Sequence, residues 1–206
     1  MITTRSYFWG NIQIANAEDT APNSNLLGNS SLLQDFINKY ERELLVRLFG
    51  IEMYTEFSAQ FDVDPTTKEW TIKTSADQKW KDLLNGVTYD GKRWNGLIQD
   101  VEGSKTSFIA NYVYCKFVEA TGIEHAGVGF TVTESKNAIR VSGASLWANA
   151  WNEMVVRLQG NCSLYPWSDL YSKNDIPLFA YLNDKSDDFP DWQQPAYFEF
   201  KNRFGL

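Results

Sequence analysis

The chain has 206 residues, of which 19 are basic and 26 are acidic, so its net charge is −7. This acidic balance argues against general affinity for nucleic acid, because phosphate contacts need many Lys and Arg side chains. The 43% hydrophobic content is that of one globular domain with a substantial core.

Targeting and redox signals are few. Met1 is followed by polar residues, and no apolar run approaches the length of about 18 residues that indicates a membrane span, so we expect neither a secretory signal nor a membrane segment. Two cysteines, Cys115 and Cys162, do not make a disulfide framework, and we expect a reducing compartment.

Residues 1–29 predict an extended N-terminal arm. The segment alternates weakly at Ile12 and Ile14 and then becomes polar and rich in turn residues. Its three consecutive aromatic residues, Tyr7, Phe8 and Trp9, are too apolar to be left in water. We expect them to dock on the chain's own core or on a neighbouring protein.

Residues 30–57 predict the central helix. Ser31 and Gln34 form a capping box at its start, and Gly50 fits the left-handed position at its end, before a second short helix that reaches Phe61. We expect Glu41 on the outward face and Arg47 paired with Glu43 one turn back. The predicted core stripe consists of Leu32, Leu33, Phe36, Ile37, Tyr40, Leu44 and Leu48.

The middle of the chain predicts further helices and one hairpin. Asp90-Gly91 separates two short β-prone runs and predicts a β-hairpin over residues 87–94. A strand is expected at residues 69–73, and residues 123–136 suggest a loop with one strand. Helices are predicted over residues 75–84, 104–121 and 137–159.

The last 46 residues, 161–206, predict a C-terminal arm. Four prolines interrupt the segment, yet it is rich in aromatic residues that a flexible linker would not hold. We expect it to pack on another chain or to wrap its own domain. The residues that we expect at interfaces are Tyr7, Phe8, Trp9, Trp192, Tyr197, Phe198, Phe200 and Phe204.

The predicted fold is mainly α: an antiparallel helical bundle core with a small β-hairpin and extended terminal arms. The boundaries are an arm at residues 1–29, a helical core at 30–160 with the hairpin near 87–94, and an aromatic-rich arm at 161–206.

Chemistry-bearing motifs are weak. The run from Gly86 to Arg93 is one residue short of a phosphate-binding loop, and it places Arg where that loop needs Ser or Thr. His125 is the sole histidine, so neither a zinc cluster nor a histidine-based triad can be assembled with ordinary ligands. Glu52 and Glu56 lie one turn apart, which is usual on a solvated helix face. We expect no enzymatic activity, no cofactor and no metal site.

Within residues 26–160 the chain resembles the head-to-tail connector (neck or adaptor ring) proteins of tailed bacteriophages, including those of crAss-like phages. The matching pattern is a set of spaced residues in several segments. These are Phe36-Ile37, Tyr40-Glu41, Leu44-Leu45, Leu48-Phe49-Gly50, Met53-Tyr54, Asn85-Gly86, Trp94-Asn95-Gly96-Leu97, Thr121-Gly122 and Asn149-Ala150 with Asn152. The tail after Gly160 is not covered.

The resemblance implies a structural virion protein, assembled in the host cytoplasm, that forms a homo-oligomeric ring, usually a dodecamer. Its implied partners are the portal protein and tail or neck proteins, with DNA passing through the lumen without sequence-specific binding. An acidic ring is physically sensible, since a lumen that attracted phosphate would hinder sliding.

Two alternatives stay open. In the same class, the chain is a tail-tube terminator or another tail adaptor. In a different class, it is a carbohydrate-binding or glycan-hydrolysing protein that uses loop tryptophans and an acidic pair.

Overall fold

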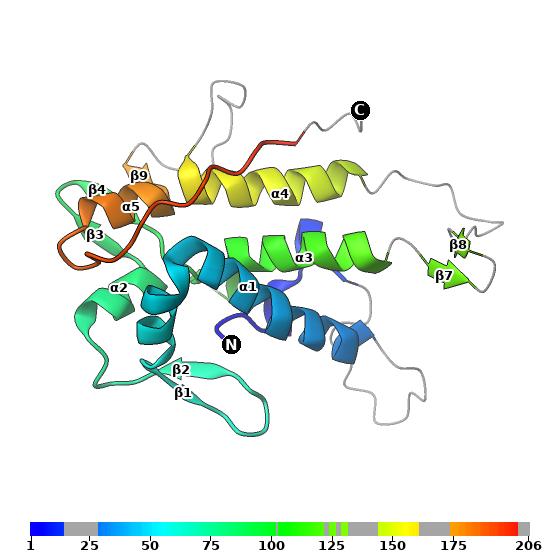
Figure 1. Ribbon diagram of the computed structural model, residues 1–206, viewed down its shortest axis with the longest axis horizontal. Coiled ribbons are helices and arrows are strands. Elements are labelled where there is room, and N and C mark those ends of the chain that lie inside the picture. The colour runs from blue at the N-terminus through cyan, green and yellow to red at the C-terminus, as the bar shows by residue number, and fades with distance from the viewer. Residues whose placement is uncertain are drawn as a thin grey trace.

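The computed structural model describes seven stretches of the chain: residues 1–14, 29–101, 103–121, 124–126, 129–131, 144–160 and 174–201. Three helices form the body, with α3 packed between α1 and α4 (Figure 1). Two shorter helices, α2 and α5, lie at one end of this body beside the strands β3, β4 and β9. The helices are α1 (Asn29–Ser58), α2 (Gln78–Asn85), α3 (Phe108–Thr121), α4 (Ala144–Gln159) and α5 (Leu178–Asp184).

Helix α1 follows the predicted stripe except at its start, where Leu32 is 40% exposed. Leu33, Ile37, Leu44 and Leu48 are fully buried, because their spacing of three or four residues places them on one side of the helix. At Gly50 the backbone leaves the helical region, with φ 78° and ψ 165°, and a second helical segment follows. The predicted break at this glycine is therefore confirmed.

Short strand pairs connect the helices. All are antiparallel, except that β9 (Asp175–Ile176) lies parallel to β4. The pairs are β1 (Phe61–Val63) with β2 (Trp70–Ile72), β3 (Val87–Tyr89) with β4 (Lys92–Trp94), β5 (Gln99–Val101) with β6 (Ser104–Thr106), and β7 (Glu124–Ala126) with β8 (Gly129–Thr131).

The prediction of a mainly α bundle is wrong. The structure is 52% helix and 13% strand, which is a mixed α/β fold. Part of the difference lies at residues 104–106, which were predicted to begin a helix but pair with β5 instead. Helix α3 starts after them, where the Ser107 hydroxyl oxygen accepts a hydrogen bond from the Ile109 N–H at 3.2 Å.

The hairpin predicted over residues 87–94 is confirmed, with Val87 opposite Trp94. Its turn has positive φ at Asp90 (47°) and Gly91 (75°), as a tight hairpin turn requires. At the base of the hairpin the pairs Asn85-Gly86 and Asn95-Gly96 lie against each other. A Cβ on Gly86 would lie 2.6 Å from the Trp94 carbonyl oxygen, and one on Gly96 would lie 2.6 Å from that of Leu84. Only glycine fits at these two positions.

The described terminal segments, residues 1–14 and 174–201, lie against the body. Residues 1–14 form two 3₁₀ turns, Arg5–Tyr7 and Gly10–Ile12, where an extended arm was expected. The C-terminal segment runs along α4 (Figure 1). Each of these two segments contributes side chains to the core.

Candidate functional site

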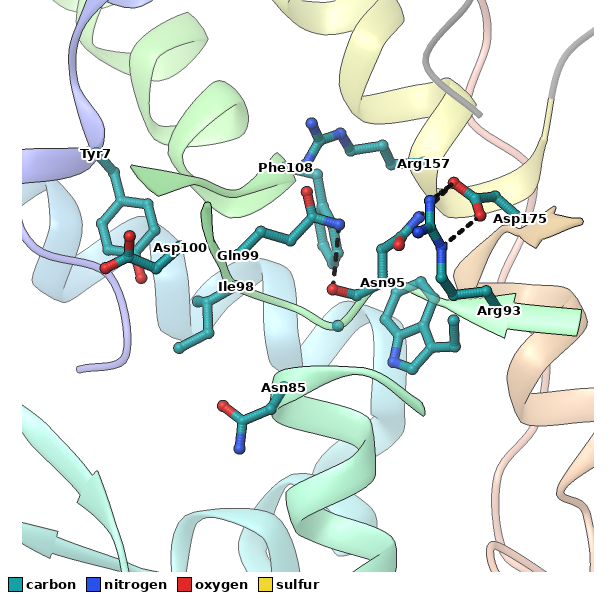
Figure 2. Close-up of a pocket in the computed structure, with 12 residues that line it drawn as sticks. Tyr7, Asn85, Arg93, Asn95, Ile98, Gln99, Asp100, Phe108, Arg157 and Asp175 are labelled. Carbon is teal, nitrogen blue, oxygen red and sulfur yellow. Dashed lines mark hydrogen bonds and ion pairs between the residues drawn. The ribbon is translucent and has the colours of Figure 1, made fainter. Parts of the chain in front are cut away.

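A cavity of about 510 Å³ opens between the hairpin base and the body. It is bounded by the N-terminal arm, the two Asn-Gly pairs, β5, the start of α3, the end of α4 and β9 (Figure 2). The side chains that line it are Tyr7, Asn85, Arg93, Trp94, Asn95, Ile98, Gln99, Asp100, Phe108, Arg157 and Asp175.

One wall of this cavity is an ion pair. Arg93 donates from Nε to Asp175 Oδ1 at 2.7 Å and from Nη2 to Asp175 Oδ2 at 2.9 Å (Figure 2). The Asn95 amide donates a further hydrogen bond to Asp175 Oδ2 at 2.8 Å. The Asp175 side chain is buried, and its hydrogen bond raises the pKa of Arg93. Since β4 and β9 pair at these residues, the ion pair fastens β9 to the hairpin.

The opposite wall carries Tyr7 and Asp100, whose side chains lie next to each other (Figure 2). Burial raises the pKa of Tyr7 to about 12, and the Asp100 carboxylate adds to the rise. Arg157 lies at the upper edge, 3.5 Å from the Glu153 carboxylate. Two guanidinium groups, two carboxylates and several amides can bind a polar ligand. Among the described lining residues, no nucleophile lies beside a general base.

The predicted interface residues of the N-terminal arm have different environments. Tyr7 and Phe8 are buried in the chain's own core, each 5% exposed. Trp9 is 47% exposed, and its indole N–H donates to the Lys105 carbonyl at 2.5 Å. The arm thus places one aromatic side chain inside the body and its neighbour outside it.

The C-terminal arm repeats this arrangement. Phe198 is 3% exposed, whereas Tyr197 beside it is 66% exposed. Trp192 is half-buried, and its indole N–H donates to the Leu48 carbonyl at 2.9 Å. Phe200 packs partly buried against the core, and Phe204 lies outside the described residues. Of the predicted interface residues, Trp9 and Tyr197 therefore keep the largest exposed surface.

Glu41 is the polar residue that sequence reasoning misplaced. It was expected on the outward face of α1, but it is 2% exposed and holds the start of the chain. Its carboxylate accepts hydrogen bonds from the N–H groups of Ile2 and Thr3, both at 2.8 Å, and from the Thr3 hydroxyl. Burial raises the pKa of Glu41, and these hydrogen bonds oppose the rise.

Arg47 and Glu43 were expected to pair with each other, but each contacts another segment of the fold. Arg47 lies over the Phe198 ring at 4.3 Å, and Glu43 accepts a hydrogen bond from the Tyr112 hydroxyl at 2.7 Å. Both side chains therefore contact other segments of the fold. Arg47 thereby links α1 to the C-terminal arm through a cation–π contact.

The remaining candidates do not converge on a catalytic arrangement. Glu52 and Glu56 are exposed on α1. His125 lies in β7. In the described part of the chain no cluster of three or more His, Cys, Asp or Glu side chains has the geometry of a metal site. Within the same residues, no helix is long and apolar enough to cross a membrane.

Comparisons with known proteins add no external guide. Protein-family models, curated proteins and solved structures were all compared with the chain, and none matches it. The function is therefore inferred from the arrangement of its own residues.

Proposed function

We propose that this chain is a structural subunit of a phage neck, a head-to-tail connector that forms a ring between portal and tail. The observation that supports this most is the pair of exposed aromatic side chains, Trp9 in the N-terminal arm and Tyr197 in the C-terminal arm. An assembly subunit needs apolar surface in fixed positions that a partner can cover.

The arms fix these aromatic side chains through their neighbours in sequence. Phe8 and Phe198 are each at most 5% exposed, so each arm is anchored in the core directly beside the exposed ring. Large aromatic side chains held in this way lose little conformational entropy when a partner buries them.

The two arms lie near opposite faces of α4. Its residues Trp151, Asn152 and Gln159 hydrogen-bond to the C-terminal segment. Glu153 lines a cavity beside Trp9, and Arg157 lines the cavity that includes Tyr7. At about 100° per residue these two sets lie on nearly opposite sides of the helix. Unlike surfaces on opposite sides of a subunit favour heterologous contacts, which close into a ring when the rotation allows it.

The remaining parts of the proposal come from the resemblance. The ring is a dodecamer that binds the portal on one side and tail proteins on the other, inside a virion that is assembled in the host cytoplasm. DNA passes through its lumen without sequence-specific contacts, which suits a chain of net charge −7.

Solution mass tests the proposal. We expect native mass spectrometry and light scattering to detect a large cyclic oligomer at high concentration or when portal protein is added. The substitution Trp9→Ala or Tyr197→Ala should lower the oligomer fraction, while the helical content measured by circular dichroism stays unchanged. Val63→Ala, which removes an apolar side chain 50% exposed on β1, is the matched control. A chain that stays monomeric with portal present refutes the proposal, and binding to a tail-tube end instead indicates a terminator or adaptor.

One observation favours a second candidate, glycan binding. Trp9 borders a cavity of about 300 Å³ that is also lined by Asn111 and Glu153. The Asn111 amide nitrogen is buried with no hydrogen-bond partner among the described residues. An aromatic ring beside amide and carboxylate groups suits a sugar. Saturable quenching of tryptophan fluorescence by oligosaccharides, lost in Trp9→Ala, would support this candidate.

A further inference from the structure

The main chain of the C-terminal segment is held by side chains of α4. Gln159 accepts from the Phe198 N–H at 2.8 Å and donates to the Phe198 carbonyl at 2.9 Å. Asn152 accepts from the Lys201 N–H at 2.7 Å and donates to the Lys201 carbonyl at 2.9 Å. Between them, the Trp151 indole donates to the Glu199 carbonyl at 2.8 Å. We call Trp151, Asn152 and Gln159 the amide clamp.

The clamp has the spacing of an extended peptide. Asn152 and Gln159 are seven residues apart, which is about 10.5 Å along a helix. Phe198 and Lys201 are three residues apart, which is about 10 Å along an extended chain. These two distances match, and the segment runs antiparallel to α4. Because both amides bind backbone groups, they recognise the extended conformation itself.

Side-chain contacts add selectivity to this binding. Phe198 and Phe200 face the body, while Tyr197 and Glu199 between and beside them are exposed. The Phe198 ring packs against Trp151 at a centroid distance of 6.2 Å and beneath the Arg47 guanidinium at 4.3 Å. Side chains of α1 and α4 therefore form a surface, here called the groove, that accepts an extended segment with the pattern aromatic-x-aromatic.

We propose that this groove, within the ring proposed above, binds residues 198–201 of a neighbouring copy, so that the C-terminal arms are exchanged around the ring. The groove is already complementary to this segment, and an exchanged copy would restore the same contacts. The link between the anchors Trp192 and Phe198 is mostly exposed. It makes one side-chain hydrogen bond of 3.2 Å, from Asn183 to Gln194, and one ring contact, between Tyr197 and Phe179 at a centroid distance of 6.3 Å. Pro195 within the link disfavours a helix and keeps it extended.

The link sets a geometric limit on the exchange. Six residue steps separate Trp192 from Phe198, and they span about 20 Å when fully extended. The groove of the neighbouring copy must therefore open within about 20 Å of Trp192. At a ring contact this close, the local concentration of the neighbour's groove is in the millimolar range.

Photo-crosslinking of the full-length chain tests the exchange. Phe200 is replaced by p-benzoylphenylalanine, and equal amounts of ¹⁴N-labelled and ¹⁵N-labelled chains are dissociated by dilution, mixed and concentrated into the oligomer. After illumination, mass spectrometry identifies the links between residue 200 and peptides of α1 or α4. We expect about half of these links to join one light and one heavy chain, as random neighbours in a ring would.

Two variants test the clamp. Asn152→Ala combined with Gln159→Ala should remove the mixed-isotope links and reduce the oligomer, whereas Glu199→Ala, with its side chain 89% exposed, should change neither. An oligomer in which every link joins peptides of the same isotope refutes the exchange and leaves the ring standing. A chain that stays monomeric refutes the ring and the exchange together.

Discussion

The buried carboxylate of Glu41 gives the sharpest test of how the chain is held together. It accepts three hydrogen bonds from Ile2 and Thr3, and both residues are buried. In Glu41→Ala these donors lose their acceptor in a place that bulk water does not reach. Each buried polar group left without a partner costs about 1–3 kcal/mol.

We expect Glu41→Ala to lower the free energy of unfolding by about 3–5 kcal/mol, the sum over the backbone donors and the hydroxyl after partial relaxation. Glu41→Gln keeps one acceptor oxygen and should cost about half as much. Urea unfolding followed by circular dichroism measures both values. A second readout, cleavage near the N-terminus by a dilute protease, should increase in Glu41→Ala, because the start of the chain detaches first.

Glu52→Ala is the matched control, since it removes the same charged side chain from an exposed position on the same helix. It should change the free energy of unfolding by no more than about 0.5 kcal/mol. If Glu41→Ala stays within that range too, the carboxylate does not hold the first residues, and the reasoning about the buried start of the chain is refuted.

Three further predictions concern other parts of the fold. Gly86→Ala should lower the free energy of unfolding by about 3 kcal/mol or more, because its Cβ would overlap the Trp94 carbonyl. Gly91→Ala has open space around its Cβ and a φ of 75°, so it should lower the free energy of unfolding by about 1 kcal/mol. Thermal unfolding measures both values. Asp175→Asn should cost about 2 kcal/mol in urea unfolding, because its arginine partner is half exposed and stays solvated. Burial raises the pKa of the Cys115 thiol to about 12, so at pH 8 only about one molecule in 10⁴ carries its thiolate. Peptide mass spectrometry should therefore find Cys115 unalkylated by iodoacetamide until urea unfolds the chain. Rapid alkylation of Cys115 in the native chain, or equal losses for the two glycine variants, would contradict these statements.

Local signals in the sequence were reliable where one or two residues decide the conformation. Asp90-Gly91 predicted the hairpin, because few other residue pairs tolerate two consecutive positive φ angles. Gly50 predicted the break in α1 for the same reason. The short strands at residues 99–106 were missed, since each is three residues long and has no apolar alternation to distinguish it from a helix start.

Glu41 was misplaced although its spacing carried the information. It follows Ile37 by four residues and precedes Leu44 by three, which is the spacing of the buried stripe. Its charge suggested the outward face, because carboxylates are seldom buried without partners. The partners are the first residues of the chain, and no local pattern in α1 reveals that distant pairing.

The C-terminal arm was predicted only in part. Its aromatic content indicated that it packs against protein, but the groove that receives it is built from α1 and α4. The amides of Asn152 and Gln159 look like ordinary polar positions of a helix until the extended segment lies beside them. Contacts between segments so far apart in sequence are set by the whole fold, which a single sequence does not disclose.

The position of α4 between the two chain ends has a mechanical consequence. A close-packed helix moves as a rigid rod, so a twist of α4 about its own axis would displace the contacts at its two flanks in opposite directions. Such a twist would couple the N-terminal arm to the C-terminal segment through α4 itself. In the ring proposed above, α4 would then be the element that links a contact made by one arm to a contact made by the other.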